Sequence, residues 1–130
     1  MPTPTRLAPI LSVRRGRTAI EFYEAAFGAK VLFRIDDEGG AVVAQLSIDG
    51  AEFWVADESP EHANFSPESL SGSTARMLLT VDDPHKVWAD AIAAGATEVW
   101  PVGEQHGWLT GRVVDPFGHH WEISKPIESQ

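Results

Sequence analysis

The sequence predicts an α+β fold in which two βαβββ modules form an open half-barrel around a central cavity, with the helices outside. The chain of 130 residues fits a single domain, 1–130, because single domains mostly contain about 100 to 200 residues. About residues 6–57 show one order of patterns, strand, helix, strand, strand, strand, and about residues 74–125 show it again. A connection rich in Ser, Pro and Glu, residues 57–73, joins the two modules.

The first module begins with a strand that includes Val13 and continues into a helix. Thr18 and Glu21 have the spacing of a capping box, and Gly28 is the expected end of the helix. The apolar residues that recur at helical spacing are Ile20, Tyr23 and Phe27. This segment therefore predicts an amphipathic helix that packs on a sheet.

The second module repeats this order with different residues. Asp83 is the expected N-cap, Pro84 occupies the first helical position, and Gly95 ends the helix. The expected buried face of this helix consists of Val87, Trp88, Ala91 and Ile92. Val13 of the first module corresponds to Val81 of the second, which sets the alignment of the two halves.

Each module closes with two strands joined by a turn. Residues 41–57 are interrupted by Asp49-Gly50, and residues 108–125 are interrupted by Asp-Pro-Phe-Gly at 115–118. The order of elements, the helix ends and the turns agree between the halves, which indicates an internal repeat. A cavity between two such modules is where a small ligand is expected to bind.

Composition limits the classes of partner. The net charge of −9 disfavours nucleic acid and anionic membranes, because both require a basic surface. The chain has no cysteine, which excludes disulfides, thiolate metal ligands and cysteine nucleophiles. Residues 1–16 contain no apolar run as long as a signal sequence or a membrane span. We therefore expect a cytoplasmic protein with a small-molecule partner.

Two motifs resemble a known superfamily. The stretches "AIEFYEAAFGAKVLF" after the first strand and "DPFGHHWEI" near the end resemble the vicinal oxygen chelate superfamily, which includes glyoxalase I, bleomycin-resistance proteins and extradiol dioxygenases. They are most similar to its PhnB-like branch, and the resemblance covers nearly the whole chain. It implies the half-barrel fold and a homodimer that completes its cavities across a two-fold interface. Members range from enzymes to proteins that only bind a drug, so the activity must come from the site.

The resemblance also implies four metal-ligand positions, one on the first strand and one on the last strand of each module. Counting five residues back from the two aligned valines, and aligning the turn glycines, places them at Ala8, Trp54, Arg76 and Glu122. Only Glu122 has a side chain that can bind a divalent metal, and Arg76 would repel one. We therefore expect no metal and no other cofactor.

The two histidines of "HHWE" raise one alternative. Strand alternation sends His120 and Glu122 to one face, and His119 and Trp121 to the other. A rearranged metal site would combine His120 and Glu122 with His106 from the "GEQHGW" loop. The more common role of such histidines is to bond backbone groups at a strand end or to lie at the rim of a cavity.

The cavity is expected to hold a charged pair and several tryptophans. Arg76 and Glu122 lie at equivalent depth, where they form an ion pair, hold a ligand, or do both, and Glu122 is the candidate catalytic base. The expected substrate-binding residues are Trp54, Arg76, Trp108 and His120. Trp100 and Trp121 also map near the cavity, although core packing suffices to explain Trp100.

Three functions follow from this site. The first is the binding of a small planar or anionic molecule without the usual metal, with or without catalysis. The second is an antibiotic-sequestering protein of the bleomycin-resistance kind, for which the acidic surface would suit a cationic drug. The third is a metal-dependent lyase or dioxygenase with a rearranged site.

Overall fold

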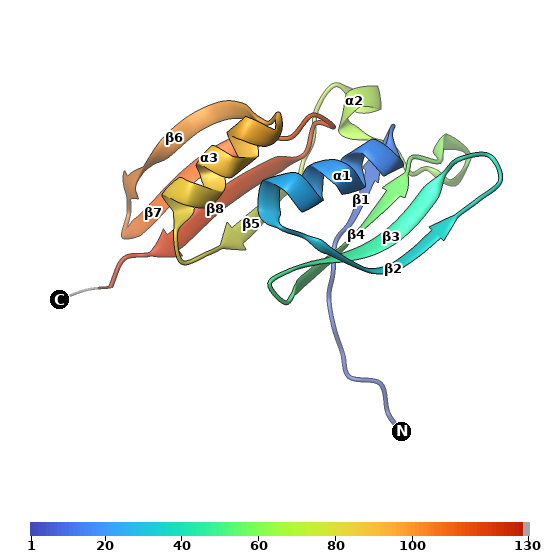
Figure 1. The fold of residues 1–130 in the computed structure, drawn as a ribbon, viewed down its shortest axis with the longest axis horizontal. Helices are drawn as coiled ribbons and strands as arrows, with labels where there is room; N and C mark the ends of the chain where they lie inside the picture. Colours follow the sequence, from blue (N-terminus) through green and yellow to red (C-terminus); the bar gives the residue numbers. More distant parts are fainter. Residues whose placement is uncertain (129–130) are drawn as a thin grey trace.

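A computed structural model describes residues 1–128 and has the predicted α+β architecture (Figure 1). The first module consists of β1 (Ile10–Val13), α1 (Gly16–Phe27), β2 (Lys30–Asp36), β3 (Val42–Ile48) and β4 (Ala51–Asp57). The second consists of β5 (Arg76–Thr80), α3 (Pro84–Ala94), β6 (Thr97–Gln105), β7 (Trp108–Val114) and β8 (His120–Pro126). The connection between them contains a short 3-10 turn, η1 (Pro60–His62), and a one-turn helix, α2 (Pro67–Leu70).

The two sheets have the same strand order. One is β1-β4-β3-β2 and the other is β5-β8-β7-β6, and in each the first strand runs parallel to the last. Ile10 pairs with Trp54 in the first sheet, and Leu78 pairs with Glu122 in the second. These pairs are related by the same spacing as Gly50 and Gly118, so the register of the internal repeat is confirmed.

Helices α1 and α3 lie side by side on the same side of the two sheets and contact each other (Figure 1). Each sheet therefore has one face covered by a helix and one open face, and the sheets do not close into a barrel. No helix within residues 1–128 is long and apolar enough to cross a membrane.

The start of α1 differs from the prediction. The helix begins at Gly16, so Thr18 lies inside it and the predicted capping box with Glu21 is wrong. The backbone N–H of Gly16 instead donates to Asp57 at the end of β4, with a distance of 3.0 Å. A Cβ atom at Gly16 would lie 2.5 Å from the Asp57 carboxylate, so only glycine permits this approach. A residue distant in sequence has taken the place of a local cap.

Other predicted boundaries are confirmed. Gly28 ends α1 in the left-handed conformation, with φ of 66°. Asp83 caps α3 by accepting from the N–H of Lys86, and Pro84 is the first helical residue. Asp49 and Gly50 both have positive φ, as a two-residue hairpin turn requires.

A buried acidic residue of the second module, Asp115, joins it to the core of the first. Tyr23 Oη of α1 donates to an Asp115 carboxylate oxygen at 2.5 Å, and Trp121 Nε1 donates to the same oxygen at 3.0 Å. The other oxygen accepts from the N–H groups of Phe117 and His119, each at 2.9 Å. Asp115 is 4% exposed, and its carboxylate has four donors around it.

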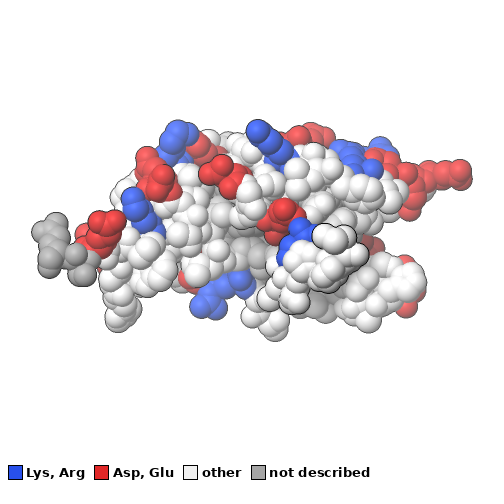
Figure 2. Space-filling model, turned by 90° about the horizontal axis from the view of Figure 1, so that it is seen from below, with Lys and Arg blue, Asp and Glu red and all other residues white. Residues whose placement is uncertain are grey.

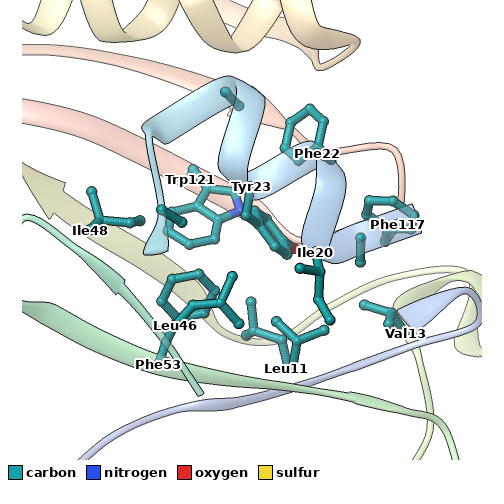
Figure 3. Packing of buried hydrophobic residues seen from close by; sticks show 14 of the residues in the cluster. Leu11, Val13, Ile20, Phe22, Tyr23, Leu46, Ile48, Phe53, Phe117 and Trp121 are labelled. Carbon is teal, nitrogen blue, oxygen red and sulfur yellow. The ribbon is translucent and has the colours of Figure 1, made fainter. Parts of the chain in front are cut away.

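Aromatic side chains pack around the two donors Tyr23 and Trp121 (Figure 3). The ring of Trp121 lies 5.5 Å from those of Tyr23 and Phe53, and Phe117 is fully buried beside Phe22. Burial and the adjacent carboxylate raise the pKa of Tyr23 well above its ordinary value. The Tyr23 hydroxyl is therefore a stable donor at neutral pH, and the turn at 115–118 fixes the two modules to each other.

Candidate functional site

The open face of the second sheet carries the polar residues that the sequence placed in the cavity. Strand alternation puts Arg76 of β5, and His120 and Glu122 of β8, on this face, because Trp121 and Ile123 between them are buried. β7 adds Arg112, which is the register partner of Glu122. The two antiparallel strands thus place Arg112 and Glu122 side by side.

Glu122 lies between two arginines. Arg76 Nε donates to Glu122 Oε1 at 2.5 Å, and Arg112 Nη1 lies 3.9 Å from the same oxygen. The Arg112 guanidinium also lies over the ring of Trp100, 5.0 Å from its centre. Arg112 is held on two sides, and only 22% of its side chain is exposed, against 56% for Arg76.

This cluster contains one more positive group than negative groups. That local excess contrasts with the net charge of −9 of the whole chain. Most charged side chains lie on the side that carries the helices, which faces the viewer in Figure 1 and is uppermost in Figure 2, and the opposite side is largely uncharged. Two guanidinium groups on a weakly charged surface favour an anion.

Several polar atoms of the cluster lack a partner within residues 1–128. They are Arg112 Nε, His120 Nδ1 and Trp100 Nε1, and all three are buried. Burial, and next the charge of Arg112, lower the pKa of His120 from its ordinary value of 6.5, so its ring is neutral at pH 7. Because the three atoms are buried, a ligand could bond to them only if neighbouring side chains move.

A pocket of about 370 Å³ adjoins the cluster at the start of β7. Glu122, Trp108, His106 and Leu78 contribute to its walls, and Trp108 is 38% exposed at its rim. The alternative metal site of His106, His120 and Glu122 is not assembled, because no three His, Asp or Glu side chains of the described chain converge enough to hold a metal ion.

Trp54 lies apart from this cluster. It occupies the open face of the first sheet, where its ring is 6.0 Å from that of Phe33. Its pocket is formed with Arg6, Ala8 and Gln45, and contains neither Arg76 nor Glu122. Within one chain, the structure brings together Arg76, Glu122, His120 and Trp108, but not Trp54.

The structure gives roles other than lining the cavity to Trp121, Trp100 and His119. Trp121 is 2% exposed and belongs to the core, so its predicted place beside the cavity holds only for one edge of the ring, which reaches the cleft between the sheets. Trp100 supports Arg112 instead of filling the core. His119 bonds the backbone carbonyl of Ser12 at 2.9 Å, as expected for a strand-end histidine.

Arg112 is a residue of the site that was not predicted, although its place opposite Glu122 follows from the sequence. The turn at 115–118 fixes the pairing of the flanking strands, and counting outward from it places residue 112 opposite residue 122. Alternation along "WLTGRVV" then puts Trp108, Thr110 and Arg112 on the face of Glu122. The expected metal-ligand positions of this module lie on β5 and β8, and none lies on β7.

Comparisons with known proteins agree with this architecture. The sequence profile of the glyoxalase/bleomycin resistance protein/dioxygenase superfamily matches residues 6–123. An uncharacterized protein of Mycobacterium bovis is 36% identical over 126 residues, covering 93% of this chain and 83% of that protein. A solved gene product of Arabidopsis thaliana is 28% identical, with a TM-score of 0.71, and the match covers 94% of this chain and 99% of that one.

A glyoxalase-related enzyme from Fulvimarina pelagi has the same fold. The TM-score is 0.70 at 20% identity, and the match covers 94% of this chain and 88% of that one. At this identity the likeness concerns the fold alone. With a profile that spans nearly the whole sequence and the repeated βαβββ module, the chain belongs to the glyoxalase/bleomycin resistance protein/dioxygenase superfamily.

Proposed function

We propose that the protein binds a small planar anion at the cluster of Arg76, Arg112 and Glu122, without a metal ion. The observation that carries this proposal is that one carboxylate lies between two guanidinium groups, at 2.5 Å and 3.9 Å. A second carboxylate, from a ligand, would balance the remaining positive charge. Glu122 orients Arg76, and it is the candidate base if a reaction takes place.

The metal-free part of the proposal rests on the residues at the four positions where metal-dependent relatives are expected to hold their ion. Ala8 and Trp54 have no donor atom suited to a metal, and Arg76 is cationic. Glu122 is already paired with Arg76. The PhnB-like branch remains our assignment within the superfamily, on the strength of the "DPFGHHWEI" motif.

We propose a homodimer for the assembly. The open face of the first sheet exposes large apolar side chains: Ile10, Phe33, Ile35 and Val43. A second copy that covers this face would remove them from water. If the first sheet of one chain lies over the second sheet of the other, Trp54 stacks on a ligand held by the partner's arginines.

Benzoate binding tests the proposal, because benzoate is a planar anion without other functional groups. We expect Arg112→Lys to weaken binding about 10- to 100-fold, since a lysine lacks the planar fork and its hydrogen bonds. Arg17→Lys is the matched control, because Arg17 pairs with Asp36 on the exposed surface of α1. Titration calorimetry that gives equal affinities for the wild type and for Arg112→Lys would overturn the proposal.

Drug sequestration is the second candidate, and one observation favours it. Phe33 and Trp54 form an aromatic surface on the open face of the first sheet, apart from Arg76 and Arg112. Such a surface suits a large flat molecule, and the acidic chain suits a cation. Binding of bulky aromatic cations, with loss on Trp54→Ala and no response to benzoate, would favour this function over anion binding.

A further inference from the structure

A cleft of about 460 Å³ separates the two sheets beside the proposed anion site. It lies between β5, an edge strand of the second sheet, and two parts of the first module, the segment 7–9 before β1 and the β3–β4 hairpin. Its walls are mainly apolar, and they include Ile48, Phe53, Met77, Leu79 and Trp121. A cavity of this size and composition suits a small ligand with an apolar body.

Arg76 belongs both to the cleft and to the charged cluster. Its guanidinium lines the mouth of the cleft, and its Nε is bonded to Glu122. Within residues 1–128, its Nη groups have no hydrogen-bond partner in the protein, and 56% of the side chain is exposed. The arginine is thus fixed at one nitrogen and free to donate at two others.

The cleft has one other charged wall residue, Glu52. Its carboxylate accepts a hydrogen bond from Gln45 Nε2 at 2.7 Å and is exposed to solvent at the start of β4. The apolar walls offer no partner to a second charge, so a dicarboxylate or a phosphate ester would leave a charge unpaired inside the cleft. The available cation at the mouth is Arg76.

We propose that the ligand is an arylalkyl or alkyl monocarboxylate, with its apolar body in this cleft and its carboxylate on Arg76. This inference rests on the proposed function, because it uses the same arginine cluster, and it adds the chemical class of the ligand. Leu78 lines both the cleft and the pocket beside Glu122, and Arg76 lines the cleft while its Nε is bonded to Glu122. A ligand of this class would place its carboxylate on Arg76 and its apolar body in the cleft.

Three probes separate the two contributions: phenylacetate carries both groups, acetate carries the carboxylate alone, and 2-phenylethanol carries the ring alone. We expect phenylacetate to bind about 10- to 100-fold more tightly than acetate, from burial of the ring. Ala51→Phe fills the cleft from an exposed position at the start of β4 and should remove most of this difference. The control is Ala93→Phe, on the exposed side of α3.

A second variant, Leu78→Glu, places a negative charge at the mouth from a side chain that is 60% exposed and outside the core. We expect it to weaken phenylacetate at least as much as Ala51→Phe, and unfolding midpoints verify that each variant folds. Acetate and phenylacetate of equal affinity, both weakened by Arg112→Lys, would overturn the cleft inference and leave the proposed function intact. Tighter binding of 2-phenylethanol than of phenylacetate would overturn the assignment of a carboxylate. Failure of every carboxylate to bind would remove the proposed function itself.

Discussion

The two faces of β8 differ in how completely their polar groups are satisfied. On the face toward the helices, Trp121 and the adjoining Asp115 are buried, and each polar atom has its partner. On the open face, Glu122 is shared between two arginines, and a buried nitrogen of His120 has no partner among residues 1–128. The same "DPFGHHWEI" motif thus builds the core with alternate residues and places a carboxylate and an imidazole on the open face with the others. The difference separates residues that hold the fold from residues that are available to a ligand.

The largest effect on stability is expected for the face of β8 toward the helices, which we call the closed face. Asp115→Ala removes the acceptor of four buried donors, and we expect the free energy of unfolding to fall by about 3 kcal/mol or more. Urea denaturation measures this change. The control is Asp90→Ala, which breaks an exposed pair with Lys86 and should cost less than about 1 kcal/mol. Similar losses for the two variants would show that the buried carboxylate does not join the modules.

The titration of the Tyr23 hydroxyl reports on the packing of the closed face. It is the only tyrosine of the chain, so phenolate absorbance reports this residue alone. Its pKa is raised by burial and by Asp115, so the stability linked to Tyr23 is present below the unfolded value of about 10 and is lost as the pH rises toward the folded value. We expect the absorbance of the folded protein to titrate well above pH 10. Titration near the ordinary tyrosine value in the folded state would mean that the hydroxyl is open to solvent.

Variants on the open face should change ligand binding more than they change stability. We expect Glu122→Gln to change the free energy of unfolding by less than about 1 kcal/mol, because its partner Arg76 is more than half exposed and can be solvated. Binding of benzoate should nevertheless change, since the charge between the arginines is removed. Thermal unfolding and calorimetry on one preparation provide both readings. A large loss of stability would place Glu122 among the structural residues of β8.

The smallest expected effect concerns His120. Burial and Arg112 hold its pKa below 6.5, so the unfolded chain binds this proton more readily, and a small part of the stability is lost as the pH falls through the unfolded value. Proton NMR should show His120 titrating below the ordinary histidine value of 6.5. We expect Arg112→Met to move the His120 pKa upward, with Arg17→Met as the unchanged control. Identical His120 titration in the wild type and in Arg112→Met would show that the charge of Arg112 does not influence His120.

Most of the fold could be predicted from the sequence because the residues that determine its helix ends and turns are close together in the sequence. The capping of α3 by Asp83, the glycine at 28 and the turns at Asp49-Gly50 and 115–118 each depend on neighbouring residues, and their repetition fixed the register. The cap of α1 could not be predicted in this way. It comes from Asp57, on a strand that reaches Gly16 only after folding.

Part of the site could be predicted from the sequence for the same reason. Arg76 and Glu122 follow from the repeat, and the pairing of Arg112 with Glu122 follows from the turn once alternation is applied to β7. The distance between Trp54 and the arginines was not accessible, because it depends on how two modules with the same pattern pack through α1 and α3. Local patterns place a residue on a face of a sheet, and the packing of the modules decides which faces meet.

Site-resolved NMR of the arginine side chains is the most direct test of an anion site on the open face. The Nε–Hε signals of Arg76 and Arg112 are followed during titration with benzoate, with the indole signal of Trp88 of α3 as an internal reference away from the cleft. We predict saturable shifts of both arginine signals at one common affinity, with little change at the Trp88 indole, whose Nε1 is buried. Arginine signals that stay unchanged at saturating benzoate, or that shift no more than the signal of surface Arg17, would contradict the account.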